Sequence, residues 1–241
     1  YGHFIELNNF QLRTESLPVL PAGSPDFRIL HISDMHMIPG QQKKIDFMHS
    51  LAALEPDLVM NTGDNLSHVD GMGPLLEALD PLMDFPGVFV PGSNCYFAPV
   101  FKNPARYLWQ PRTPQMIEEG SRVALPIERM HEAFESRGWT GLVNRYDTLN
   151  LKGLRLEFSG VDDPHLRYDE HPGFAPGAFD EGQEPSVRIG VAHAPYMRTL
   201  YRFVQDGAQA IFAGHTHGGQ VCLPGGHALV SNCDLPPSRA K

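Results

Sequence analysis

Three apolar segments, each followed by a residue that can bind a metal, recur at a regular spacing early in the chain. They are "FRILHIS" (27–33), "DLVMNTG" (57–63) and "GVFVPG" (87–92). Asp34, Asp64 and Asn94 come directly or shortly after them, at intervals of 30 residues. One such interval has room for a strand, a helix and their turns. The spacing therefore predicts parallel strands joined by right-handed helical crossovers.

The intervening segments favour helices. Segment 42–56 places apolar residues near helical spacing and stops at Pro56. Segments 73–85, 126–139 and 196–206 are predicted as further helices.

Later segments favour strands. Residues 141–163 alternate apolar and polar side chains around Lys152-Gly153, which predicts a hairpin. Residues 187–195 and 208–219 predict two more strands, and a last hairpin is expected after them.

We expect one α/β domain over residues 1–241, with residues 1–26 as an extended lead-in. Hydrophobic residues make up 41% of the chain and charged residues 20%, which is typical of a globular protein with a sizeable core. The chain begins at Tyr1 and ends in the loop-like stretch "DLPPSRAK". We therefore expect that both termini are trimmed.

Charge and composition exclude several classes of protein. The net charge is -9 and no Lys/Arg run is present, which argues against a nucleic-acid surface. Three Cys are too few for a disulfide framework or a Cys-rich zinc site, and they fit a reducing compartment. No apolar run approaches the roughly 18 residues of a transmembrane helix, and no signal peptide is visible. The expected location is cytoplasmic or membrane-associated.

Five predicted strands end in residues that commonly bind metals. These residues are Asp34 and His36, Asp64, Asn94, His193, and the pair His215 and His217. Ligand sites of α/β folds gather at the carboxyl ends of the strands, so these side chains should converge. In an extended chain, Asp34 and His36 would point to the same side. Glycines at 63, 92 and 214 would allow sharp turns beside the site.

The ordered motifs resemble those of the calcineurin-like metallophosphoesterase superfamily: Asp-x-His, Gly-Asp, Gly-Asn-His-Asp/Glu, a lone His and Gly-His-x-His. The resemblance covers about residues 27–234. "HISDMH", "NTGDN" and "AGHTHGGQ" are similar to a small bacterial subgroup that is often membrane-associated through an N-terminal anchor. Membrane association through a segment outside this chain is therefore expected.

The resemblance implies a four-layer α-β-β-α sandwich of two mixed sheets flanked by helices. It also implies two divalent ions (Mn, Fe, Zn, Co or Ni) and a bridging hydroxide that attacks phosphomonoesters or phosphodiesters. One ion would be held by Asp34, His36, Asp64 and His217. The other would be held by Asp64, Asn94, His193 and His215. The implied catalytic residues include the bridging Asp64 and Asn94.

The chain departs from the family pattern at Cys95, where the family has a His that stabilises the transition state or protonates the leaving oxygen. In one register Asn94 is the ligand and Cys95 replaces the His. In the other, Ser93 takes the ligand position and Asn94 the His position. We favour the first, because an amide oxygen is the better neutral ligand. Cys95 is then a weak proton donor, a soft metal ligand or a small buried hydrophobe, and we favour the last.

Another residue must then supply the proton. We hypothesise His165, in "GVDDPHLRY", ahead of His68. Tyr96 and Phe97 line the substrate side or pack in the core, and the prolines of 104–114 form a lid or a rigid loop.

Two alternatives to a phosphoesterase remain open. One is a metal-binding scaffold of the same fold with weakened catalysis, which the missing His at position 95 favours. The other is a zinc hydrolase of amide bonds, which fits the motifs less well.

Overall fold

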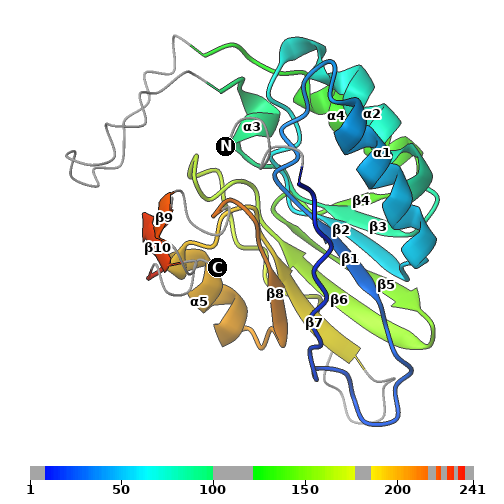
Figure 1. Ribbon diagram of the computed structural model, residues 1–241. Helices are drawn as coiled ribbons and strands as arrows, with labels where there is room; N and C mark the ends of the chain where they lie inside the picture. The colour runs from blue at the N-terminus through cyan, green and yellow to red at the C-terminus, as the bar shows by residue number, and fades with distance from the viewer. Residues whose placement is uncertain are drawn as a thin grey trace.

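The computed structural model describes residues 9–99, 122–176, 186–216, 221–223, 227–230 and 233–236, and for residues 221–223 and 227–230 it describes the backbone alone. Two four-stranded sheets lie face to face in it, and helices flank them (Figure 1). Residues 9–26 contain neither helix nor strand. Across these ranges, no helix is long and apolar enough to span a bilayer.

The first sheet is formed by the βα units of the first half. Its strands, in spatial order, are β1 (Ile29–Ile32), β2 (Leu58–Asn61), β3 (Gly87–Phe89) and β4 (Thr140–Gly141). All three neighbouring pairs are parallel.

Helices connect these strands. The α-helices are α1 (Gln42–Ser50), α2 (Met72–Leu79), α3 (Ser93–Tyr96) and α4 (Ile127–Ser136). Three short 3-10 helices are η2 (Leu51–Leu54), η3 (Val69–Gly71) and η4 (Asp80–Leu82). Helices α1, α2 and α4 cover the outer face of the first sheet (Figure 1).

The second sheet contains the predicted hairpin and the two strands that follow it. Its spatial order is β5 (Arg145–Leu151), β6 (Leu154–Gly160), β7 (Ser186–Val191) and β8 (Ala210–Phe212). β5 is antiparallel to β6, and the other two pairs are parallel. Lys152 and Gly153 form the hairpin turn with φ of 51° and 74°, the left-handed pair that tight hairpins favour.

The outer face of the second sheet carries α5 (Met197–Gln205), whose Phe203 packs against Val161 and Ala192. The last hairpin, β9 (Val221–Leu223) with β10 (His227–Val230), is antiparallel and forms a separate two-stranded ladder.

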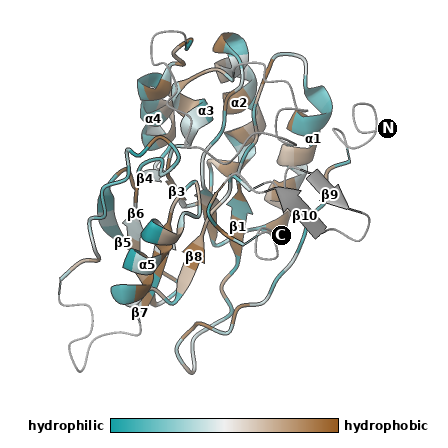
Figure 2. Ribbon diagram, turned by 90° about the vertical axis from the view of Figure 1, so that its left-hand side faces the viewer, coloured by the Kyte–Doolittle hydropathy of each residue, from teal (hydrophilic) through white to brown (hydrophobic). Residues whose placement is uncertain are grey.

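Alternate residues of β2 and β3 pack into two different hydrophobic cores, one on each face of the first sheet. Val59 and Phe89 face the helices, whereas Leu58, Met60 and Val88 face the second sheet. Figure 2 shows hydrophobic colour along β7 and β8 of the second sheet and hydrophilic patches on α1 and α5. Burial of this apolar surface, worth roughly 25 cal/mol per Å², holds the layers together.

The predicted α/β sandwich is confirmed, with one correction. Both sheets were expected to be mixed, but the described strands of the first sheet are all parallel. The reason is that α4 precedes β4 and returns the chain to the start of the sheet, so β4 runs in the same direction as β3. The structure also forms the short helix α3 where the sequence suggested a turn.

Candidate metal centre

The loops after β1 and β2 continue side by side beyond the ends of the strands. The Asp34 N–H donates to the Gly63 carbonyl at 2.9 Å, and the His36 N–H donates to the Asp64 carbonyl at 2.9 Å. These bonds continue the parallel pairing of β1 and β2 into the loops that follow the two strands. Backbone hydrogen bonds alone therefore hold Asp34, His36 and Asp64 at one edge of the sheet.

Four predicted ligand residues have a left-handed backbone: Asp34 (φ 54°), His36 (φ 46°), Asp64 (φ 51°) and His215 (φ 68°). Such conformations cost about 1–3 kcal/mol each and cluster at functional sites. The expectation that Asp34-x-His36 is extended was wrong. Sharp left-handed bends bring these two side chains together, instead of the alternation of a strand.

Glycines make this crowding possible. A Cβ at Gly92 would clash with Oδ1 of Asp64 and would lie 2.6 Å from the His193 ring. A Cβ at Gly214 would clash with the side chain of Ser33 and would lie 2.5 Å from Oδ2 of Asp34. Any larger residue at either position would displace the site, as the sequence suggested.

The first group of side chains joins Asp34, His36 and Asp64, whose potential ligand atoms lie within 4.8 Å of one another. Nε2 of His36 is 3.9 Å from Oδ1 of Asp34 and 3.8 Å from Oδ2 of Asp64. Nδ1 of His36 is hydrogen-bonded to the Ser67 hydroxyl at 3.0 Å. That bond orients the ring so that Nε2 faces the two carboxylates.

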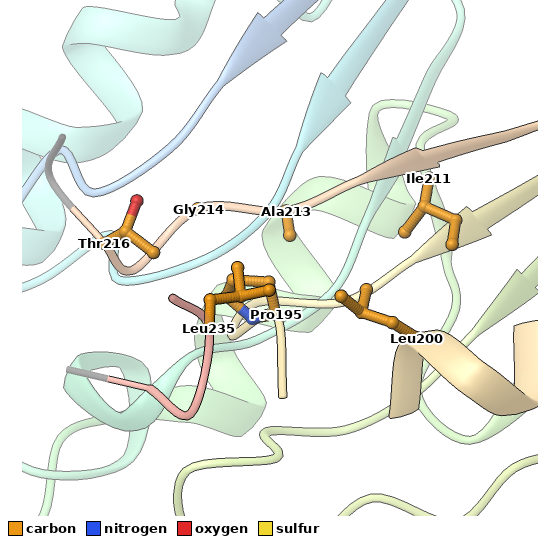
Figure 3. A pocket seen from close by; sticks show the side chains of 7 residues that line it. All are labelled: Pro195, Leu200, Ile211, Ala213, Gly214, Thr216 and Leu235. Carbon is orange, nitrogen blue, oxygen red and sulfur yellow. The ribbon is translucent and has the colours of Figure 1, made fainter. Parts of the chain in front are cut away.

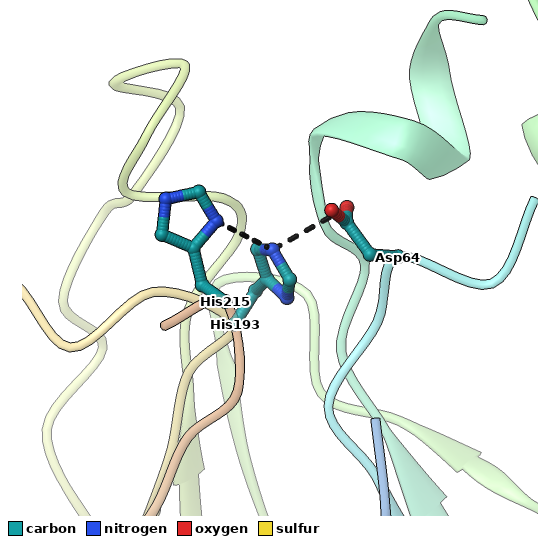
Figure 4. A group of neighbouring side chains, drawn as sticks. All are labelled: Asp64, His193 and His215. Atoms are coloured by element: carbon teal, nitrogen blue, oxygen red, sulfur yellow. Dashed lines mark hydrogen bonds and ion pairs between the residues drawn. The ribbon is translucent and has the colours of Figure 1, made fainter. Parts of the chain in front are cut away.

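The second group joins Asp64, His193 and His215, all of them buried (Figure 4). Nε2 of His193 lies 3.3 Å from Oδ1 of Asp64 and 3.2 Å from Nδ1 of His215. Nδ1 of His193 donates to the Thr62 carbonyl at 2.8 Å. With Nδ1 bonded to that carbonyl, Nε2 is the ring nitrogen that faces the other two residues.

Burial and charge shift the pKa values of this group. Burial alone would raise the pKa of Asp64, but His193 and His36 together with the Asn94 N–H lower it. Burial would lower the pKa of His193, but the Asp64 charge raises it. Burial, followed by the charge of His193, lowers the pKa of His215 to about 3. A neutral imidazole is thus favoured at His215, which is the form that binds metals.

Asn94 lies against Asp64. Its backbone N–H donates to Oδ1 of Asp64 at 2.7 Å, and its side-chain amide donates to Oδ2 at 2.8 Å. Asn94 is thus adjacent to both carboxylate oxygens of Asp64.

Cys95 is fully buried and belongs to the helix-side core. Burial, followed by the Asp64 charge, raises the pKa of the thiol to about 12. The thiol therefore stays neutral and packs as a small hydrophobe. Asn65, also buried, has its side-chain amide near the Cys95 sulfur at 3.6 Å and is satisfied inside the protein.

His165 lies on the loop after β6, and its ring is next to that of His215, with centroids 4.8 Å apart. His68, the second candidate, begins η3 and contacts the neighbouring Asp70 instead. Two predicted features, His217 and the prolines of 104–114, lie outside the described residues.

Two acidic residues of the same loop were missed. The Tyr96 hydroxyl donates to the carboxylate of Asp162, whose Oδ1 and Oδ2 lie 2.8 and 2.7 Å from it. Asp163 is fully buried, and burial raises its pKa to about 7. The consecutive carboxylates at a strand end, "GVDDP", were the signal that could have identified them.

A cavity of about 300 Å³ lies beside the turn that carries His215 (Figure 3). It is lined by Pro195, Leu200, Ile211, Ala213, Gly214, Thr216 and Leu235. None of these side chains titrates near neutral pH.

The chain is similar to known proteins in sequence and in structure. The profile of the calcineurin-like phosphoesterase family matches residues 27–219. The uncharacterized protein YpbG of Bacillus subtilis (strain 168) is 26% identical over 213 residues, covering 87% of this chain and 69% of the relative. The phosphopantetheinyl hydrolase (PptH) of Mycobacterium tuberculosis is 14% identical, with a TM-score of 0.42, over 83% of this chain and 86% of that structure.

The fold and the cluster of carboxylates and imidazoles define a metal-dependent phosphoesterase in the general sense. The chain belongs to the calcineurin-like phosphoesterase family, since the family profile matches most of its length. It is a hydrolase that acts on phosphoester bonds.

Proposed function

We propose that the chain hydrolyses phosphomonoesters or phosphodiesters at a centre of two divalent metal ions that share Asp64. The first ion would be held by Asp34, His36, Asp64 and His217. The second would be held by Asp64, Asn94, His193 and His215. His217 is assigned from its place in the Gly-His-x-His motif alone.

The position of Asp64 carries this proposal. Oδ1 faces His193 at 3.3 Å, whereas Oδ2 faces His36 at 3.8 Å. One carboxylate thus presents an oxygen to each of two groups of potential ligands. A bridging carboxylate between two cations requires this arrangement.

The side chains also fit a cation chemically. Nε2 of His193 and Nδ1 of His215 lie 3.2 Å apart, and both nitrogens are good metal ligands when unprotonated. Nε2 of His215 is buried without a hydrogen-bond partner among the described residues. Carboxylates, an amide and imidazoles suit Mn, Fe, Zn, Co or Ni.

Two bound divalent ions would provide a nucleophile from water near neutral pH and offset the charge of the phosphate. The protein's own groups orient the ligand side chains and protonate the leaving oxygen. Ser67 fixes the ring of His36, and the Thr62 carbonyl fixes that of His193. In this proposal His165, whose ring lies next to that of His215, gives a proton to the leaving oxygen.

Metal content and turnover test this proposal together. We expect two divalent ions per chain by elemental analysis, and turnover of an aryl phosphate or an aryl phosphodiester after metal is restored. The Asp64→Asn variant should lose metal and at least about 100-fold in kcat/KM, because both ions lose a charged ligand. One ion per chain, or full activity in Asp64→Asn, would contradict the two-metal centre.

A catalytically weakened metal-binding scaffold is the second candidate. The observation in its favour is that a neutral, buried Cys95 occupies the position where the family carries a His. Bound metal without turnover of any phosphoester in the panel would favour the scaffold.

A further inference from the structure

The backbone around His165 is fixed by the carboxylate that precedes it. Oδ1 of Asp163 accepts the His165 N–H at 2.9 Å, and Oδ2 accepts the Leu166 N–H at 3.2 Å. The Tyr168 N–H closes the turn on the Asp163 carbonyl at 3.1 Å. We call residues 162–169 the His165 loop.

The side chain of His165 has a partner on another element. Its Nδ1 is hydrogen-bonded to the hydroxyl of Tyr196 at 3.0 Å. Tyr196 precedes α5 and is half-buried, and burial, followed by the charge of Asp163, raises its pKa to about 12. The hydroxyl therefore keeps its proton and remains a hydrogen-bond partner across the neutral pH range. A bond at Nδ1 sets both the rotation of the ring and the roles of its two nitrogens.

Arg198, in the first turn of α5, holds Tyr196 and the His165 loop together. Its guanidinium lies over the Tyr196 ring at 5.0 Å from the centroid. One of its nitrogens donates to the Pro164 carbonyl at 2.8 Å and to the carboxylate of Asp169. Thr199 donates to the other Asp169 oxygen at 3.0 Å. The start of α5 thus contacts the His165 loop on both sides of His165, at Pro164 and at Asp169.

We propose that Tyr196 is a positioning residue that aims the His165 ring at the leaving-group oxygen, and that Arg198 keeps Tyr196 and the loop in register. This rests on the proposed function, in which His165 is the proton donor. In that reaction water releases a proton to solvent, its oxygen bonds to phosphorus and the ester P–O bond breaks. The leaving oxygen keeps the electron pair of that bond and takes a proton from His165, which solvent then replaces.

A positioning role predicts that the cost of removing Tyr196 depends on the leaving group. A good leaving group departs as an anion and needs no proton, whereas a poor one needs the acid in the transition state. A misoriented His165 ring should therefore slow the hydrolysis only of esters with poor leaving groups. Loss of structure would slow both kinds equally.

The test compares 4-nitrophenyl and phenyl esters with the same phosphoryl group on the metal-loaded enzyme. For Tyr196→Phe we expect kcat/KM to fall about 10- to 100-fold with the phenyl ester and less than about threefold with the 4-nitrophenyl ester. Arg198→Lys should show the same selectivity with a smaller loss. Tyr201→Phe is the control: it removes a tyrosine hydroxyl from an exposed position in α5 and should change neither rate.

His165→Ala, measured in parallel, separates the two levels of inference. If His165→Ala is selective for the phenyl ester but Tyr196→Phe slows both esters equally or neither, the positioning role is overturned and the proton donor stands. If His165→Ala is not selective, the proton-donor role fails, and the role of Tyr196 fails with it. Equal metal content in all variants shows that the centre itself is intact.

Discussion

Asn94 donates hydrogen bonds to both carboxylate oxygens of Asp64, from its backbone N–H to Oδ1 at 2.7 Å and from its amide to Oδ2 at 2.8 Å. The two residues come from the ends of neighbouring strands, β2 and β3. Each therefore fixes the orientation of the other. With the amide nitrogen facing Asp64, the amide group must turn to offer its oxygen to a metal.

This pairing predicts different effects of changes at positions 93 and 94. Asn94→Ala removes both the proposed ligand and an orienting bond, so we expect metal affinity to fall at least about tenfold. Ser93→Ala, the matched control one residue earlier, should leave affinity within about twofold. Metal titration by calorimetry measures both. The reverse order of losses would select the register in which Ser93 is the ligand.

Gly92 is predicted to be irreplaceable because the space that a Cβ would need is already occupied by Asp64 and His193. We expect Gly92→Ala to lose metal binding and at least about 100-fold of kcat/KM, since misplacement by 1 Å is that costly. Gly73→Ala is the control, because Gly73 lies in α2 and a Cβ added there would have no atom within 4 Å. It should stabilise the protein by about 0.5–1 kcal/mol at unchanged activity. Equal activity in both variants would contradict this description of the site.

Periodicity and strand-end chemistry were enough to predict where the candidate ligands converge. The reason is that parallel βα units bring residues 30 apart to the same edge of a sheet. The convergence of Asp34, His36, Asp64, Asn94, His193 and His215 follows from that rule. Their role as metal ligands stays a prediction.

What the sequence did not reveal depends on loop conformation. The left-handed bends at Asp34 and His36 occur at residues other than glycine, so the sequence carries no signal for them. The contact of His165 with Tyr196 joins residues on two separate connections of the second sheet. The helix α3 is only four residues long and so has no periodicity to detect.

Asp163 predicts how the stability of the metal-free protein depends on pH. Its pKa rises from 3.8 to about 7 on folding because of burial. A raised pKa means that the folded state binds the extra proton. The stabilising contribution is therefore complete below pH about 4 and is lost as pH rises through about 7.

Chemical denaturation between pH 5 and pH 8 measures this effect. The free energy of unfolding of the wild type should fall with pH by up to about 1.4 kcal/mol per unit relative to Asp163→Asn. Asp147→Asn changes a more exposed carboxylate and serves as control. Parallel curves for the wild type and Asp163→Asn would show that Asp163 is ionised in the folded protein at every pH tested.

Substitutions of Cys95 test whether a Cys in place of the family's His affects catalysis or only packing. The thiol is fully buried, and its pKa is raised to about 12. Such a group neither ligates nor donates protons near neutral pH. We expect Cys95→Ala to retain metal content and kcat/KM within about twofold, and to lose about 1 kcal/mol of stability through the cavity it leaves.

Cys95→His restores the residue type of the family and should nevertheless fail. An imidazole at this position must enter the helix-side core around the fully buried Cys95, where the nearby polar groups are the two N–H donors of Asn65 at 3.5 and 3.6 Å from the sulfur. We expect a loss of about 3 kcal/mol or more in the free energy of unfolding and no gain in rate. Thermal denaturation and phosphoester kinetics on the same preparation check this. A stable Cys95→His variant with increased kcat would show that position 95 faces the substrate, and that proton transfer does not need His165.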